Sequence, residues 1–541
     1  MKIDSLGVTL YPWQKEALDW MSSQEDGLCR GGLLCDEMGL GKTIEAMALV
    51  ATKPVNHTLI IVPPILMHQW LVWIKKIDPA VRVYENRPRD DHQWDLELGL
   101  LQKPTIVLTG FTKLLGSRSI RVRNNLTGLR KDRSPIHDIV WDRIIVDECH
   151  YLQSPTSQRT QAVLALRGEC RWGLTGTPFA KSPHQMSSLM RFLRWREGDL
   201  TGIKYHQDMN DIVLSRRIKD INVLKKKMAN LDETLHHIDF SRDEANFYFS
   251  LKGHLRERWL VDKRMRLPRW IRAKNHLLTQ SLLQLASIHP ELVFERWRQW
   301  IDTGKYNEQW TENQQETAAI FDQHWDNPDS SKMLAIDRIL RVNLKTGLRN
   351  EQRSLIFLPY RLHLDFMESW LRQKGYSVSR LDGTVKPSTR ARMLDSLTVT
   401  PYYMSRLCSK NNLPYLPPEI WRMIGTWSGN PQILLLQNRV GGVGLNLQSF
   451  SQVIFPIPMS TPSLESQAIA RSYRLGQKNN VHIHRIALKA GVEDAFINEK
   501  GAKIIPQTLD ERQLELASEK RKRINQWWDG KLEYEKEDKD E

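Results

Sequence analysis

The sequence predicts an α/β protein with two parallel β-sheet lobes in tandem and a helical insertion between them. Apolar runs of strand length alternate with helical stretches, which is the pattern of parallel sheets covered by helices. These runs fall into two clusters, one before about residue 230 and one after about residue 350. Between the clusters, from Ser241 to about Asp326, the sequence is charged and rich in tryptophan, as expected of long helices.

Strand-like runs and changes in composition divide the chain into four parts. The clearest candidates for strands are Leu59–Val62, Thr105–Leu108, Arg143–Val146, Ser354–Leu358, Gln432–Leu436 and Gln452–Phe455. We expect a first lobe over residues 1–228, a helical insertion or linker over 229–330, a second lobe over 331–505 and a charged C-terminal tail over 506–541. The second lobe contains an insertion of its own at 397–431.

Composition restricts the class of protein. The chain has 541 residues, 40% of them hydrophobic and 26% charged, which is enough to bury about two or three separate cores. Lys and Arg number 78 against 63 Asp and Glu, a balance of +15 that favours polyanions such as nucleic acid. A basic surface kept for solubility is the alternative explanation.

Membrane and disulfide classes are disfavoured by the same composition. No apolar run approaches the roughly 20 residues that a membrane span needs. The five cysteines are scattered along the chain: Cys29, Cys35, Cys149, Cys170 and Cys408. We therefore expect a soluble intracellular protein with free thiols and no structural metal.

A glycine-rich turn carries the first chemical signal. In Gly31–Thr43 an apolar run meets the turn Asp36–Gly41, and a helical run follows. Backbone N–H groups of such a turn and helix N-terminus cradle phosphates, while Lys42 reaches the β- and γ-phosphate oxygens and Thr43 holds Mg²⁺. The usual pattern has Gly where Asp36 stands, so this segment alone leaves a chance glycine-rich turn as the alternative.

Two adjacent carboxylates supply the second signal. The apolar run Arg143–Val146 ends in Asp147 and Glu148. Mg²⁺ prefers one or two carboxylates together with phosphate oxygens and water, which suits Asp147. Hydrolysis also needs a group that orients and deprotonates the attacking water, which suits Glu148. A pair of acids that caps the next helix is the structural alternative, but it leaves the phosphate-binding Lys42 unexplained.

In this order, these segments resemble the Swi/Snf-like family of helicase-related, ATP-dependent DNA translocases in helicase superfamily 2. The likeness covers most of the chain and implies two tandem RecA-like lobes with ATP and Mg²⁺ as cofactors. Asp147–His150 is similar to the family's DEAH box, with Cys149 in place of Ala. The resemblance implies nucleotide contacts by Gln14, Asp36, Gly39, Gly41, Lys42 and Thr43, and magnesium ligation by Thr43 and Asp147.

Other segments of the first lobe also match the family. Leu10–Gln14 resembles its adenine-reading segment, in which Gln14 would read the base. Ile61–Trp70 looks like the strand and turn that track a DNA backbone, which implies DNA contacts by Pro63 and His68. Trp172–Pro178 resembles the family's segment that relays hydrolysis between the ATP and DNA sites. Leu214–Lys219 resembles the Arg-Arg-x-Lys signature at the end of the first lobe.

The second lobe continues in the family's order. Its matching segments are Ser331–Lys332, Leu355–Phe357, Arg380–Thr384, Val440–Leu447 and Gln467–Gln477. The resemblance implies DNA contacts by Arg390 and Asn446, a nucleotide contact by Gly444, and arginine fingers at Arg471 and Arg474. The two arginines lie three residues apart on an expected helix, so both can face the ATP of the other lobe and stabilise the transferring γ-phosphate. A solvated helix face is the alternative for this pair.

Two segments depart from the family. After the strand that ends at Phe455 the family carries Asp and then Trp-Asn-Pro, whereas this chain has Pro456–Pro462, which leaves the contacts of that loop unassigned. The insertion 397–431 replaces a short link, and residues 416–424 within it resemble the opening of an F-box. That segment is either a local helical insertion or a site for a ubiquitin-ligase adaptor.

Three functions from different classes are compatible with these motifs. The first is a DNA-dependent ATPase that translocates on double-stranded DNA and remodels nucleosomes or other protein–DNA complexes in chromatin remodelling, repair or transcription. The second is a strand-separating helicase, and the third is a catalytically silent DNA-binding scaffold. Intact Lys42, Asp147, Glu148 and Arg474 argue against the scaffold. The expected location is the nucleus or a viral or cytoplasmic site of DNA replication, with no membrane partner.

Overall fold

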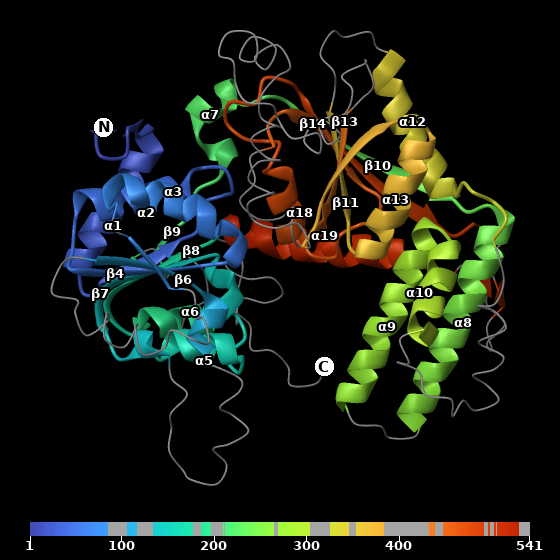
Figure 1. The fold of residues 1–541 in the computed structure, drawn as a ribbon, viewed down its shortest axis with the longest axis horizontal. Helices are drawn as coiled ribbons and strands as arrows, with labels where there is room; N and C mark the ends of the chain where they lie inside the picture. Colours follow the sequence, from blue (N-terminus) through green and yellow to red (C-terminus); the bar gives the residue numbers. More distant parts are fainter. Residues whose placement is uncertain are drawn as a thin grey trace. The chain divides into compact units, whose positions relative to one another are not determined.

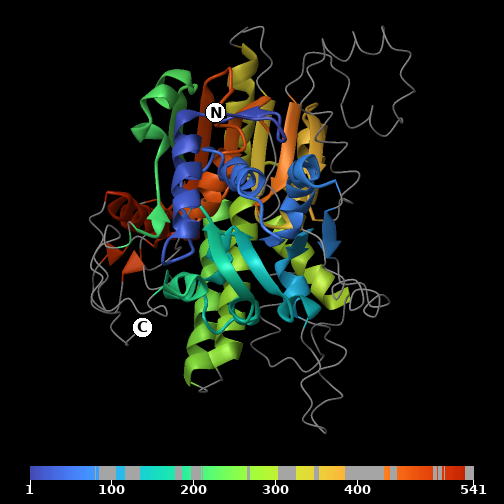
Figure 2. The ribbon, with the colours of Figure 1, turned by 90° about the vertical axis from the view of Figure 1, so that its left-hand side faces the viewer.

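The computed structural model, drawn in Figure 1 and turned by 90° in Figure 2, divides into two compact units. The first unit comprises Met1–Lys227 with Glu519–Glu541, and the second comprises Met228–Ser518. The structure describes residues 1–79, 81–84, 105–115, 134–176, 186–195, 209, 211–264, 269–302, 325–345, 353–383, 432–438, 447–491, 496–497, 503–504 and 506–529. Within these ranges no helix has the length and apolar character that crossing a membrane requires.

A seven-stranded parallel sheet forms the centre of the first unit. In sheet order its strands are β5 (Arg82–Tyr84), β6 (Thr105–Gly110), β4 (His57–Val62), β7 (Val140–Asp147), β8 (Arg167–Leu174), β3 (Gly31–Leu34) and β9 (Val213–Leu214). Helices α1 (Pro12–Asp26), α2 (Lys42–Thr52) and α3 (Met67–Ile77) lie on one face, and α5 (Gln158–Leu164) and α6 (Met186–Leu193) lie on the other (Figure 1). The unit also contains the hairpin β1 (Lys2–Ile3) and β2 (Val8–Thr9), and helix α7 (Asn222–Lys227).

Neighbouring strands of this sheet end together, which determines where the candidate site lies. The carboxyl-terminal halves of β3, β4, β7 and β8 are buried, as expected for strands covered on both faces. In the sheet register, Leu34 of β3 and Asp147 of β7 both lie beside Leu174 of β8. The loops after these strands therefore meet at the carboxyl edge of the sheet, where open α/β sheets bind ligands.

The second unit is built on a six-stranded parallel sheet. In sheet order its strands are β10 (Leu231–Asp239), β15 (Val481–Lys489), β14 (Phe450–Phe455), β11 (Arg353–Leu358), β13 (Gln432–Gln437) and β12 (Ser377–Leu381). Its helices include α8 (Arg242–Arg264), α9 (Arg269–Ile288), α10 (Glu291–Asp302), α12 (Ser331–Lys345), α13 (Arg361–Gln373) and α18 (Pro462–Ile469). The ribbon β16 (Phe496–Ile497) and β17 (Lys503–Ile504) precedes α19 (Leu509–Trp528).

The two parallel sheets confirm the predicted fold class, two tandem RecA-like lobes. Each of the six strand candidates taken from the sequence lies within an observed strand: β4, β6, β7, β11, β13 or β14. Long apolar runs identify such central strands because both of their faces are buried.

The segment 229–330 differs from its expectation as a helical insertion. Leu231–Asp239 forms the edge strand β10, which pairs in parallel with β15. Helices α8 and α10 contribute Tyr248 and Phe294 to one hydrophobic core with Ile356 of β11. These helices are therefore part of the second unit. The edge strand has no apolar run because one side of it is exposed, so it gives no strand signal of the central kind.

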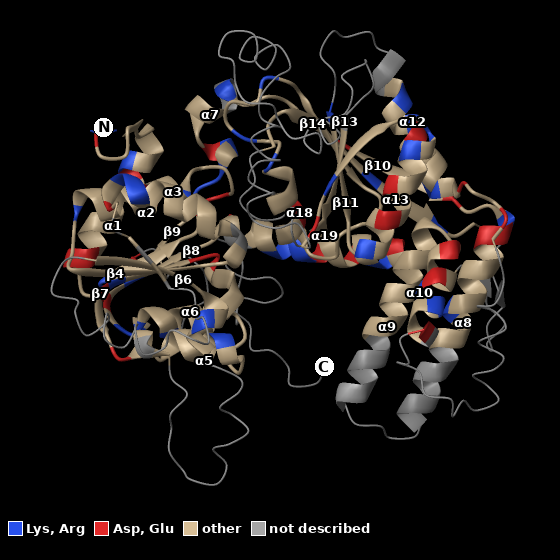
Figure 3. Cartoon of the chain, viewed as in Figure 1, with Lys and Arg blue, Asp and Glu red and all other residues tan. Residues whose placement is uncertain are grey.

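Charges on helices α12 and α13 are mixed rather than grouped by sign. Figure 3 shows Lys and Arg interspersed with Asp and Glu on α12 and α13. On these helices Arg341 pairs with Asp337 at 2.7 Å and Arg372 with Glu368 at 2.8 Å, each one helical turn apart. These two helices therefore form no uniformly basic face.

A row of polar side chains crosses the sheet of the second unit. His484 of β15 lies 3.0 Å from His236 of β10 through Nδ1, and 3.3 Å from the Gln452 amide nitrogen of β14 through Nε2. The Ser354 hydroxyl of β11 continues the row by donating to the Gln452 side-chain oxygen. Burial lowers the pKa of His484 to about 4, helped by the charges of His236 and His482, and burial also lowers the pKa of His236. The folded unit therefore favours a neutral His484.

Acid is expected to destabilise the second unit through this row. An unfolded histidine titrates near pH ~6.5, so below that pH the unfolded chain binds the proton that folded His484 refuses until about pH 4. Between pH 7.5 and pH 5 the contribution of His484 to the unfolding free energy falls by about 2 kcal/mol. Urea unfolding at both pH values checks this by comparing the wild-type protein with His484→Gln. An equal loss of stability in both proteins would remove His484 as a source of the pH dependence.

Candidate active site

The predicted phosphate loop joins β3 to α2. The chain leaves β3 at Leu34 and enters α2 at Lys42. Gly39 and Gly41 have positive φ angles of 94° and 102°, a region that side-chain-bearing residues avoid. The first N–H groups of a helix have no intrahelical acceptor, and Gly41 at the cap of α2 offers them no side-chain acceptor. Such a helix N-terminus is suited to phosphate.

The Lys42 ammonium lies against this loop. Its Nζ donates to the Asp36 carbonyl at 2.6 Å and lies 3.4 Å from the Glu37 carbonyl oxygen. A Cβ atom added to Gly176 would lie 3.5 Å from the same Nζ, so the segment after β8 approaches the loop. Thr43 follows in the first turn of α2 and is half-buried. Lys42 and Thr43 are thus placed together at the carboxyl edge of the sheet.

Two protein donors hold the carboxylate of Asp147 at the end of β7. Oδ2 accepts from the indole Nε1 of Trp70 at 2.7 Å, and Oδ1 accepts from the backbone N–H of Glu148 at 2.9 Å. Burial, and next the charge of Glu148, raises the pKa of Asp147 to about 7. A cation beside Asp147 would favour its ionised form. Glu148 itself has a φ of 51°, a strained backbone angle of the kind found at active sites.

His150 joins the DEAH-like box to the segment after β8. Its Nδ1 lies 3.1 Å from Oε2 of Glu148 and 3.2 Å from the Thr175 hydroxyl. Cys149 is fully buried, and a Cβ on Gly173 would come within 3.0 Å of its sulfur. The space around position 149 therefore suits a small side chain. The structure brings Asp147–His150 and the start of Trp172–Pro178 together.

Arg216 links the phosphate loop to two helices. Its guanidinium donates to both carboxylate oxygens of Asp36, to Oε1 of Glu45 at 3.3 Å and to the Trp13 carbonyl. Burial raises the pKa of Asp36 and of Glu45, and the charge of Arg216 opposes both shifts. Asp36, which stands at the usual Gly position, thus anchors the loop through Arg216. Both of its carboxylate oxygens accept from Arg216. The contact of Asp36 with nucleotide stays a prediction.

Gln14 is also tied to the phosphate loop. It is 4% exposed; its Oε1 accepts from the Tyr11 N–H at 3.1 Å and its Nε2 donates to the Leu40 carbonyl at 3.0 Å. The Trp13 indole donates to the same carbonyl at 3.1 Å. The rings of Tyr11 and Trp13 stack with centroids 4.6 Å apart. The segment predicted to read adenine is therefore hydrogen-bonded to the loop.

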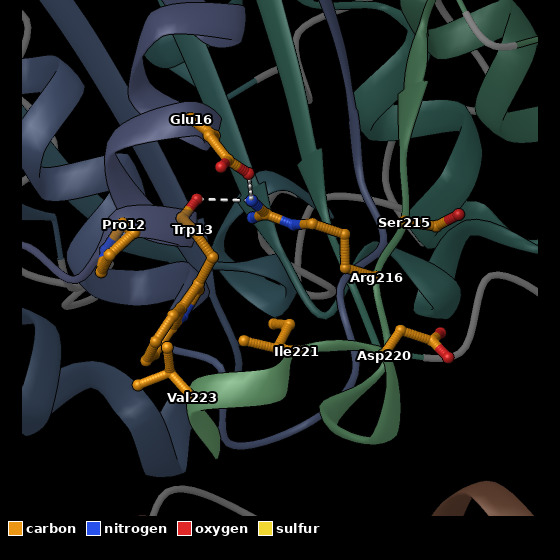
Figure 4. Close-up of a pocket in the computed structure, with 8 residues that line it drawn as sticks. All are labelled: Pro12, Trp13, Glu16, Ser215, Arg216, Asp220, Ile221 and Val223. Carbon is orange, nitrogen blue, oxygen red and sulfur yellow. Dashed lines mark hydrogen bonds and ion pairs between the residues drawn. The ribbon is translucent and has the colours of Figure 1, made fainter. Parts of the chain in front are cut away.

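A pocket opens beside this segment, and Figure 4 shows the side chains around it. Its volume is about 390 Å³. It is lined by Pro12, Trp13, Glu16, Ser215, Arg216, Asp220, Ile221 and Val223. The Trp13 ring lies next to Val223, while Arg216 bridges toward Glu16 and the Trp13 carbonyl on the other side (Figure 4). The pocket thus combines an aromatic wall with charged groups.

The segment after β4 carries the predicted DNA contacts Pro63 and His68. Pro63 is buried, whereas Pro64 and His68 are exposed. Among the side chains of this turn whose burial the structure describes, Pro64 and His68 are the most exposed. Pro63 and His68 both stay predicted DNA contacts.

The arginine-finger segment of the second unit is not helical throughout. Helix α18 ends at Ile469, and the Arg471 N–H bonds back to the Ala468 carbonyl at 3.2 Å in the turn that follows. Arg471 and Arg474 therefore lie in turns, and the expected helical spacing does not apply to them. Burial lowers the pKa of Arg474, and among the residues that the structure describes no carboxylate pairs with it. A half-buried guanidinium of this kind suits an anionic partner.

Two glutamines hold these turns in place. The Gln477 amide donates to the carbonyls of Gln448 at 2.9 Å and Phe450 at 3.3 Å. In return, the Gln448 amide donates to the Leu475 carbonyl at 2.6 Å. These reciprocal bonds connect the arginine segment to the start of β14. Sequence reasoning missed Gln448, because a lone polar residue beside a strand carries no distinctive signal.

Lys332, at the start of the second-lobe motifs, forms a buried ion pair. It is fully buried, and its Nζ lies 2.6 Å from Oδ2 of Asp510.

Gly444, Asn446, Arg390 and residues 416–424 lie outside the described ranges, so their roles stay predictions.

The sequence of the chain matches one family model and several known proteins. A model of the SNF2-related domain matches residues 13–292. The chain is 25% identical over 570 residues to the Danio rerio protein called DNA excision repair protein ERCC-6-like, covering 93% of this chain and 36% of that protein. It is 26% identical over 466 residues to the Mus musculus helicase-like transcription factor, covering 69% and 44%. The chain thus spans less than half the length of these relatives.

A viral relative and a solved structure also match. The probable global transactivator of Orgyia pseudotsugata multicapsid polyhedrosis virus is 25% identical over 491 residues, which cover 87% of this chain and 85% of that protein. The Sulfolobus solfataricus SWI2/SNF2 ATPase core in complex with dsDNA is 20% identical, with a TM-score of 0.36 and 91% of each chain covered.

Proposed function

The chain belongs to the family defined by the SNF2-related domain, and from this we propose that it is a DNA-dependent ATPase that moves along double-stranded DNA and remodels protein–DNA complexes. One observation carries the proposal: Lys42, Asp147 and Glu148 meet at the carboxyl edge of a single parallel sheet. A strained Glu148 beside a buried Asp147 is the arrangement expected where water is activated next to bound phosphate.

We propose that ATP binds along the loop from α2 to the pocket beside Trp13. The phosphates would lie at the N-terminus of α2. There the Lys42 ammonium would donate to phosphate oxygens in place of the carbonyls of Asp36 and Glu37. The base would enter the pocket of about 390 Å³, whose aromatic wall suits a planar ring. Trp13 supports this placement because it lines the pocket and its indole donates to the Leu40 carbonyl of the loop, as does the neighbouring Gln14.

Oxygen donors at this edge fit a magnesium ion. The Thr43 hydroxyl and the Asp147 carboxylate would hold it together with phosphate oxygens, a donor set that Mg²⁺ prefers. When bound, the ion neutralises charge on the β- and γ-phosphates. The neighbouring Glu148 orients the attacking water and accepts its proton. His150 supports Glu148, since its Nδ1 lies 3.1 Å from the Glu148 carboxylate.

The partners proposed are duplex DNA and, less directly, nucleosomes or other DNA-bound proteins. The first-lobe candidates are Pro63 and His68, beside the exposed Pro64, and Arg390 and Asn446 are the second-lobe candidates. The net charge of +15 supports a polyanionic partner. Relatives named for repair, transcription and a viral transactivator support work in the nucleus or at a viral site of DNA replication.

Duplex DNA is expected to raise the rate of ATP hydrolysis several-fold, with little preference for sequence. The stimulation should fall steeply between about 50 and 200 mM salt, because phosphate contacts release counterions. Hydrolysis measured without nucleic acid, with single strands and with duplex checks this. Equal rates in all three at low salt would count against a DNA-dependent enzyme.

A further inference from the structure

Two fully buried tryptophans of the first unit, Trp70 and Trp172, donate their indole N–H groups to carboxylates, those of Asp147 and Glu25. Trp70 is fully buried on the first turn of α3, and its Nε1 donates to Oδ2 of Asp147 at 2.7 Å. A buried indole N–H needs an acceptor, and a backbone carbonyl is sufficient. Trp141, fully buried in the same unit, has such a partner, the Ile136 carbonyl at 3.1 Å. Trp70 instead uses the carboxylate assigned to magnesium.

The topology explains how this contact arises. Strand β4 pairs with β7 so that Ile61 lies beside Val146, one residue before Asp147. The chain therefore leaves β4 next to this carboxylate, passes through the short turn Pro64–Leu66, and enters α3. Trp70 then points back toward the end of β7. One hydrogen bond thus connects the segment assigned to DNA with the carboxylate assigned to magnesium.

The same short segment has an exposed and a buried side. Pro64 and His68 are exposed, while Leu66, Trp70 and Ile74 are buried. Close packing on the buried side makes the turn and α3 move as one body. A shift of the exposed side would therefore move the indole N–H relative to Asp147.

From this geometry we propose that Trp70 is a positioning residue, which orients the Asp147 carboxylate and connects it to the DNA-facing turn Pro64–His68. The inference rests on the proposed function, because it takes the Mg²⁺–ATP site and the duplex DNA from there. With the donor in place, one lone pair of Oδ2 is committed and the carboxylate plane is set. Without it, Oδ2 loses its donor and the carboxylate can rotate away from the geometry that Mg²⁺ demands.

Trp70→Phe tests the positioning role, with Trp141→Phe as the matched control. Each change removes one buried indole N–H, but only the first removes a donor to Asp147. The readout is the affinity for a fluorescent ATP analogue, measured in EDTA and in Mg²⁺. We expect Trp70→Phe to bind within about twofold of wild type in EDTA and to lose about 10–100-fold of the gain that Mg²⁺ brings, the range for partners of metal ligands. Trp141→Phe should keep that gain.

A double variant and the wild-type protein strengthen the binding test. Adding Trp70→Phe to Asp147→Asn should cause no further loss of the Mg²⁺ gain, because both changes act on one carboxylate. Should Trp70→Phe fail to fold, hydrogen exchange on the wild-type protein decides. Amides of α3 should exchange more slowly with the analogue and Mg²⁺ than with the analogue in EDTA, and an unchanged rate overturns the proposal.

The connection to DNA has its own readout, the ratio of turnover with duplex to turnover without it. Trp70→Phe should reduce this ratio severalfold, while Trp141→Phe keeps the wild-type ratio. If Trp70→Phe matches Trp141→Phe in both the Mg²⁺ gain and the ratio, the proposal is wrong. If only the ratio is unchanged, the connection to DNA is overturned and the positioning role stands. A wild-type protein with no stimulation by DNA contradicts the proposed function, and the Mg²⁺ binding arm then still judges Trp70.

Discussion

Glu148→Gln is expected to bind ATP nearly as well as the wild-type protein and to lose hydrolysis, by at least about 10²–10⁴-fold, the range for a missing general base. Glu148 acts on water rather than on the nucleotide, so the amide removes the proton acceptor while leaving the phosphate loop intact. Lys42→Ala should abolish hydrolysis as well, but through lost contacts to the phosphates. Nucleotide binding measured alongside turnover separates these two outcomes.

Glu169→Gln provides a matched control for this prediction. Glu169 lies in the same unit with 56% of its side chain exposed and pairs with Arg30 at 2.9 Å on the surface. Surface ion pairs contribute little, so turnover should stay at the wild-type level. Turnover near wild type in Glu148→Gln itself would remove Glu148 from its catalytic role.

Arg474→Ala is expected to cut turnover by about 10³-fold or more, the scale of an arginine finger. If Arg474 is the arginine finger, it would meet the γ-phosphate only while ATP is bound, and hydrolysis would release that contact. ATP and DNA binding should therefore stay within a few-fold of wild type, and adding DNA should not restore the rate. Arg474 is half-buried, and this burial lowers the pKa of its guanidinium, a cost that a phosphate partner would offset.

The control for Arg474 is Arg361→Ala on α13. Arg361 is 66% exposed, and its Nε lies 3.9 Å from Asp365, so its loss should leave turnover unchanged. DNA-stimulated turnover near wild type in Arg474→Ala would show that Arg474 is not the finger. Arg471, in the same turn, would then become the candidate.

The elements that sequence reasoning identified are those with strong local signals. Buried runs such as Leu59–Val62 and Arg143–Val146 were recognisable because parallel strands covered on both faces are continuously apolar. The phosphate loop and Asp147 were also recognisable, because the residues that define each motif are contiguous in the sequence. Strand β10 was not recognisable, because Leu231–Asp239 is a charged edge strand with one exposed side.

The contacts that complete the candidate site are separated widely along the chain. Trp70 and Asp147 lie 77 positions apart, and Asp36 and Arg216 lie 180 apart. No local pattern encodes such pairs. One general signal was present for the second: an acid in a buried loop needs a cation nearby, and the Arg-Arg signature was a source of one. Trp70 lies in a segment that the resemblance assigns to DNA contacts, so no sequence pattern indicated its contact with Asp147.

The measurement that tests the central claim most directly is displacement of a third strand from a DNA triplex, run beside separation of a forked duplex. A motor that moves along duplex DNA is predicted to release the third strand only with ATP and to leave the forked duplex paired, while Glu148→Gln releases nothing. Release that needs no ATP, or strand separation of the fork without third-strand release, would contradict the account.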